Sequence, residues 1–97
     1  MLIQTPYKVG DIVSIKLASG EEMVARLEEE RDSHIMLKKP LMLVASDTGI
    51  GLAPFMFTVD PDHKFRIRLN NIICVVKTSK DATSAYIQQT TGLAVLS

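Results

Sequence analysis

A regular alternation of apolar and polar residues around a glycine turn is the feature that most constrains this chain. A period of two places every second side chain on the same face of an extended strand. The apolar members of the pattern are Val13, Ile15, Leu17, Met23, Ala25 and Leu27. Ser19-Gly20 separates the two runs, and Gly can take the positive φ of a tight turn. The pattern predicts two antiparallel strands, about residues 12–18 and 22–29, that share one apolar face.

Further strands are predicted downstream and continue an antiparallel meander. They cover about residues 34–44, 52–59, 64–69 and 72–76, with a flexible loop at residues 46–51. We expect the first of them to bend at Pro40, because proline cannot donate to a strand ladder. The last is an unbroken apolar run. It predicts a strand that is buried on both faces, with Cys74 as a small core residue.

The last part of the chain changes character. Ser79 or Asp81 is a suitable helix cap, and Gly92 is a suitable stop. Between them, side chains recur at helical spacing at Ala82, Ala85, Tyr86 and Gln89. We therefore predict one domain over residues 1–97, with a barrel at about 9–78 and a short C-terminal helix or docked tail at 79–97.

Composition narrows the class of protein. The 97 residues include 11 basic and 11 acidic side chains, so a strong overall attraction to nucleic acid is not expected, although a local basic patch is allowed. The single cysteine excludes an internal disulfide and is typical of a reducing compartment. No apolar run approaches the ~20 residues of a membrane span, and no secretion signal is evident. We expect a cytoplasmic protein that does not bind membranes.

Few side chains are arranged for catalysis or metal binding. The chain has no Ser–His–acid order, Gly-rich phosphate loop or paired catalytic carboxylates. His63 follows Asp60 and Asp62, but no further ligand stands at a typical spacing. The sequence therefore predicts no enzyme, no metal site and no cofactor. The acidic run Glu28–Glu30 has two open interpretations, a solvated strand edge or a docking surface for a basic partner.

A nucleic-acid contact is the more specific possibility. Arg66 and Arg68 lie two residues apart and share a strand face, and His34 opens a strand after a polar turn. Guanidinium groups bind phosphate, and an imidazole ring stacks on bases. A solvated strand face and a surface histidine without a role are the competing interpretations.

The strand pattern resembles the Sm-like (LSm/Hfq) family, and in particular its phage-associated members, over about Val9–Lys77. The first family motif matches residues 12–17, Gly20, residues 23–27 and Asp32-Ser33-His34-Ile35-Met36-Leu37. The second matches Ile67-Arg68-Leu69-Asn70-Asn71-Ile72. The resemblance implies a mainly β fold, a small open barrel of about five strongly bent antiparallel strands. It also implies a cyclic homo-oligomer of about five to seven subunits, built by pairing exposed strand edges.

The resemblance also suggests roles for individual residues. Arg68 would contact phosphate or base, His34 would stack, and Asn70 would line the turn beside them, with Arg66 at the pore or rim. The family's base-binding Asn falls on Met36 or Ile35, and Leu69 stands where the family has Gly.

These observations lead to one expected function and two alternatives. We expect a ring-forming, non-catalytic protein that binds or chaperones single-stranded RNA. The first alternative is a phage-related interaction or structural scaffold that has lost the base pocket and has a protein partner. The second is a monomeric SH3-like adaptor.

Overall fold

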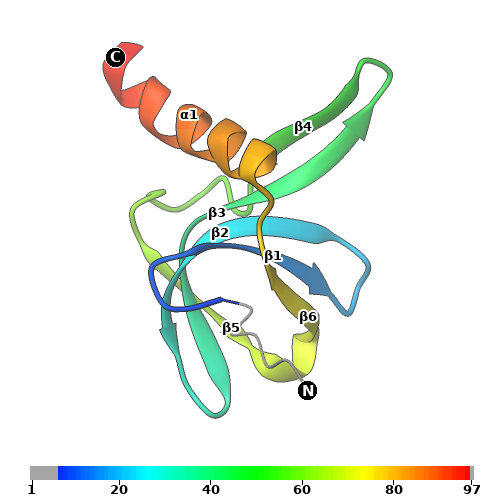
Figure 1. The fold of residues 1–97 in the computed structure, drawn as a ribbon, viewed down its shortest axis with the longest axis vertical. Coiled ribbons are helices and arrows are strands. Elements are labelled where there is room, and N and C mark those ends of the chain that lie inside the picture. The colour runs from blue at the N-terminus through cyan, green and yellow to red at the C-terminus, as the bar shows by residue number, and fades with distance from the viewer. Residues whose placement is uncertain (1–6, 97) are drawn as a thin grey trace.

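The computed structural model describes the backbone of residues 7–96 and the side chains of residues 7–91 (Figure 1). Its elements are β1 (Ile12–Leu17), β2 (Glu22–Glu30), β3 (His34–Ser46), β4 (Gly49–Pro54), β5 (Lys64–Arg68), the 3-10 turn η1 (Leu69–Asn71), β6 (Ile72–Lys77) and α1 (Lys80–Leu96). The predicted mainly β fold with a C-terminal helix is confirmed.

All strand pairs belong to one antiparallel sheet. The order is β4-β3-β2-β1-β6, and β5 pairs with β3 on the same side as β4. The long strand β3 pairs with β5 through residues 34–38 and with β4 through residues 41–46. Between these two segments, Lys39 has a φ of 51° and precedes Pro40, which lacks an N–H. The break expected at Pro40 is therefore the point where β3 changes partner.

The inner face of the sheet forms the main core. Its buried side chains are Val13, Ile15, Met23, Ala25, Leu27, Ile35 and Leu37. Ile67 of β5 and Val75 of β6 pack on this same cluster, although these strands do not pair with each other. The sheet must curve strongly for both to reach one core, and it remains open between them (Figure 1). Burying each Leu or Ile side chain contributes about 1.5–3 kcal/mol.

Helix α1 covers part of the opposite, outer face of the sheet. It begins after Ser79, whose Oγ accepts a hydrogen bond from the Ala82 N–H at 3.3 Å. Tyr86 is 2% exposed and packs on Ile12 and Val24 in a second, smaller core. The helix continues through Gly92, so the predicted stop there is wrong. Among the described residues, no helix has both the length and the apolar character needed to span a bilayer.

The region between β3 and β5 differs from the prediction. The strand predicted at residues 52–59 is confirmed only at residues 52–54, because β4 spans Gly49–Pro54 and residues 55–63 form a loop. The flexible loop predicted at residues 46–51 is wrong. Gly49, with a φ of 127°, allows a tight turn there, and pairing therefore continues from Ser46 to Gly49.

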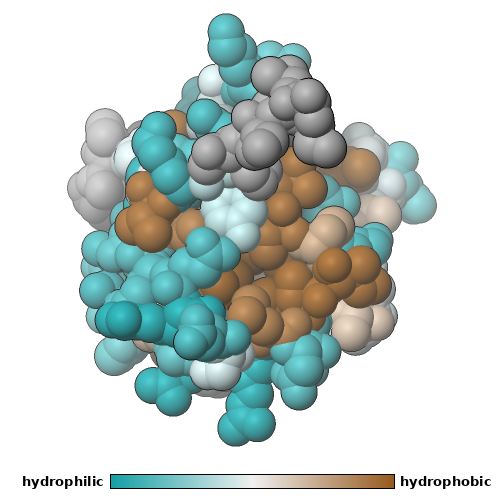
Figure 2. Space-filling view, turned by 60° about the horizontal axis from the view of Figure 1, so that its bottom comes forward, coloured by the Kyte–Doolittle hydropathy of each residue, from teal (hydrophilic) through white to brown (hydrophobic). Residues whose placement is uncertain are grey.

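Strand β6 was expected to be buried on both faces, and this is wrong. Within the described residues it pairs only with β1, so its other edge is open. Ile73 is 65% exposed and Val76 is 53% exposed, and Cys74 is exposed rather than a core residue. Figure 2 brings this end of the molecule forward and shows an apolar area beside a hydrophilic one. An apolar run alone does not show how many faces of a strand are covered.

Candidate functional site

The four residues predicted to bind RNA lie together in the structure. His34 opens β3, Arg66 and Arg68 lie on β5, and Asn70 belongs to η1. The strand register places His34 directly opposite Arg68. With Ser33 and Leu69, these residues line an open depression of about 510 Å³.

The local sequence explains this arrangement. Ile67 packs on the inner core, and Phe65 lies opposite the buried Leu37. Because side chains alternate along a strand, Arg66 and Arg68 point outward. The carbonyl of Ser33 accepts a hydrogen bond from the Leu69 N–H at 3.0 Å. This bond ties the turn before β3 to η1 and holds the two sides of the depression together.

The two arginines keep their charge available. Among residues 7–91, neither Arg66 nor Arg68 has a carboxylate within the 4.0 Å of an ion pair. Glu29 lies one strand away, opposite Met36, and binds Arg31 instead. The guanidinium donors are therefore free to bind an external anion.

The acidic run of β2 is divided among local partners. Glu28 pairs with Lys64 at 3.7 Å, Glu29 pairs with Arg31, and Glu30 accepts a hydrogen bond from the Tyr7 hydroxyl at 2.7 Å. That hydrogen bond is the main reason why the pKa of Tyr7 is raised to about 12. Each of the three acidic side chains thus has a partner within this chain.

The cationic surface extends beyond the predicted residues. Lys38 of β3 lies opposite Arg26 of β2 on one side and opposite Lys64 of β5 on the other. These three cations form a row across three strands on the outer face. The sequence analysis missed this row. The alternation along residues 64–68 could have placed Lys64 on the same face as Arg66 and Arg68. The position of Lys38 and Arg26 beside Lys64 depends on the register between strands, which the sequence of one strand does not show.

This arrangement suits recognition of a single-stranded nucleic acid. Arginine binds phosphate through paired N–H donors, and the imidazole of His34 offers a ring for stacking. The side-chain amide of Asn70 can both donate to and accept from a base edge.

Among the described residues, no three His, Cys, Asp or Glu side chains are grouped to hold a metal ion. The Asp60 carboxylate accepts the Asp62 N–H at 2.8 Å, within the turn before β5.

The sequence was compared with known protein families and with curated proteins. Neither comparison gives a match. The resemblance to the Sm-like family therefore stays a prediction from the sequence motifs.

Proposed function

We propose that this protein is a non-catalytic, Sm-like RNA-binding protein that acts as a cyclic homo-oligomer in the cytoplasm. The observation that carries the proposal is the shared depression of His34, Arg66, Arg68 and Asn70, in which neither guanidinium group has an ion pair among the side chains of residues 7–91. Phosphate contacts would supply affinity, and the ring and amide would supply contacts to bases.

The two ends of the sheet support assembly into a ring. Within the described residues, β5 pairs only with β3 and β6 only with β1, so each of these two strands leaves one edge free. Pairing the β5 edge of one copy with the β6 edge of the next is a head-to-tail contact that closes when the rotation allows it. It would also cover Ile73, and it would repeat the cationic depression around the ring. Repetition strengthens weak contacts through avidity.

The substitution Ile73→Lys tests the assembly. It places a charge on the β6 edge and should convert a ring of about five to seven chains into monomers. Size-exclusion chromatography with light scattering measures the mass. Lys16→Ala on the neighbouring strand β1 is the control and should leave the ring intact. A wild-type monomer at micromolar concentration would overturn the ring.

The RNA contact is tested by fluorescence anisotropy with oligouridine and oligoadenine. Wild-type binding should weaken strongly between about 50 and about 200 mM salt. Arg68→Ala should weaken binding and lower the salt slope by about one. Lys16→Ala, which removes a charge outside the depression, should change neither quantity. Binding that ignores both salt and Arg68 would refute a phosphate contact at this site.

A protein-interaction scaffold is the second candidate, and one surface favours it. A hollow of about 520 Å³ lies where β3 bends, and its apolar lining is Pro40, Leu41, Pro54, Phe55, Met56, Pro61 and Phe65. Phe57 in the adjoining loop is 80% exposed. Large exposed aromatic side chains are typical of protein interfaces. A stable ring that binds neither oligonucleotide would favour this candidate.

A further inference from the structure

A second hollow lies between helix α1 and the outer face of β2 and β3. Its volume is about 150 Å³, and it is separate from the His34 depression. The sheet contributes Arg26, Glu28, Lys38 and Lys39, and the helix contributes Tyr86, Ile87, Thr90 and Thr91. Three cationic side chains thus surround this hollow with a single carboxylate.

Two of these cations repel each other and have no carboxylate partner among the described residues. Arg26 lies directly opposite Lys38, and like charges opposite each other destabilise a sheet. Among residues 7–91, neither side chain forms an ion pair. The carboxylate of Glu28 is held by Lys64 at 3.7 Å. A bound anion would turn this repulsion into a favourable interaction.

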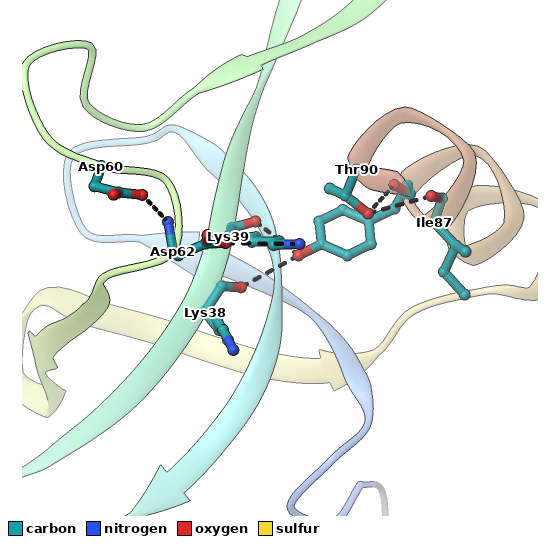
Figure 3. Close-up of polar contacts among 7 residues, drawn as sticks. Lys38, Lys39, Asp60, Asp62, Ile87 and Thr90 are labelled. Atoms are coloured by element: carbon teal, nitrogen blue, oxygen red, sulfur yellow. Dashed lines mark hydrogen bonds and ion pairs between the residues drawn. The ribbon is translucent and has the colours of Figure 1, made fainter. Parts of the chain in front are cut away.

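The hollow is also organised before any ligand arrives. Nη1 of Arg26 donates to the Gly10 carbonyl at 2.8 Å, which fixes the guanidinium and leaves its other N–H groups available. The Tyr86 hydroxyl donates to the carbonyls of Lys39 and Lys38, at 2.7 and 3.2 Å. Figure 3 shows these carbonyls of β3 facing the helix turn that carries Ile87 and Thr90.

The backbone at this point is unusual. Lys39 has a φ of 51°, a conformation that residues other than Gly adopt rarely. Its ammonium group lies 3.8 Å from the carboxylate of Asp62, across the turn from Asp60 (Figure 3). The left-handed residue places Lys38 and Lys39 around one hollow, and strained backbone of this kind is concentrated at functional sites.

We propose that this hollow binds a phosphate-type oxyanion, with Arg26 and Lys38 as the main donors and Lys39 at its edge. Charge-assisted N–H bonds from a fixed guanidinium and an ammonium suit such a group. The site does not depend on the proposed RNA function, because it uses other residues. The same chemistry is offered by a free phosphate and by a backbone phosphate of a nucleic acid.

Inorganic phosphate is the first probe. Its binding is monitored through amide chemical shifts in NMR spectra at constant ionic strength. The wild type should show saturable shifts at Arg26, Lys39 and Thr90. Lys38→Gln should raise the dissociation constant at least about tenfold. Lys16→Gln removes an outer-face lysine that lies outside this hollow, and it should leave the constant unchanged. Among residues 7–91 the Lys38 side chain forms no ion pair, and the substitution keeps the backbone carbonyl that Tyr86 binds, so this variant should fold.

An oligouridine titration then separates the two sources. Saturable, Lys38-dependent shifts with inorganic phosphate support a free-anion site. The same shifts with oligouridine alone support a backbone phosphate. Arg68→Ala should leave the phosphate result unchanged, so a failure of the RNA function would not be mistaken for a failure here. No Lys38-dependent shift with either probe, or shifts confined to His34 and Arg68, would overturn the proposal.

Discussion

The two faces of the sheet differ in composition and in role. The inner face is apolar from β1 through β3, and side chains of β5 and β6 pack on it from both ends of the sheet. On the outer face, Tyr86 covers a small apolar cluster, and β2, β3 and β5 also present the cations Arg26, Lys38 and Lys64 there, with the carboxylate of Glu28 beside them. The comparison teaches that alternation assigns one set of residues to the fold and leaves the other set available for ligands.

A cavity in the inner face is the strongest test of the difference between the two faces, because it should have the largest effect on stability. Leu37 is fully buried, and Leu37→Ala should lower the free energy of unfolding by about 2–5 kcal/mol. Denaturant unfolding measures this loss. Val44→Ala is the control, because Val44 is 47% exposed on the hairpin arm. Equal losses in the two variants would contradict the assignment of the core.

The next effect concerns the tie between α1 and the outer face. Tyr86→Phe keeps the ring in its cluster but removes the hydroxyl that bonds the Lys38 and Lys39 carbonyls. Carbonyls left unpaired should cost about 1–2 kcal/mol of unfolding free energy. Thermal and denaturant unfolding measure this value. No loss would mean that the hydroxyl does not hold the helix on the sheet.

Alkaline pH should affect the same tie. Burial raises the pKa of Tyr86 to about 12 from its ordinary value of about 10. Below pH 10 both the folded and the unfolded chain keep the proton, so this group adds no pH dependence. Between about pH 10 and 12 the unfolded chain loses the proton first, so stability falls as pH rises. Tyr86→Phe should reduce that slope. Tyr7→Phe should also reduce it, because the pKa of Tyr7 is raised to about 12 as well, and the double variant should show the two reductions together.

The smallest expected effect lies in the outer-face arginines. Arg66 and Arg68 are exposed and make no ion pairs within the described residues. Arg66→Ala and Arg68→Ala should each change the free energy of unfolding by less than about 0.5 kcal/mol. Denaturant unfolding checks this expectation. A larger loss would mean that the arginines support the fold rather than bind a ligand.

Much of this molecule could be predicted from period-two patterns. The patterns located β1, β2 and β5, and they placed Arg66 and Arg68 on one face. They could not show that β6 lies at an edge of the sheet. The exposure of β6 depends on whether another strand pairs with its second edge, and its own sequence does not show this. The Lys38 row also escaped prediction, because it results from the register of three strands.

The depression itself was partly predictable. His34 and Asn70 were selected through the motifs, and the structure brings them beside Arg68. The helix-side hollow was not predictable. It requires α1 to cross the outer face at Tyr86 and requires Lys39 to adopt a left-handed backbone, and neither feature leaves a periodic signal.

A native mass spectrum with added oligouridine tests the central claim most directly. The account predicts a ring of about five to seven chains that carries RNA, and a ring without RNA for the variant with alanine at both Arg66 and Arg68. A wild-type monomer, or RNA retained equally by that variant, would contradict the account.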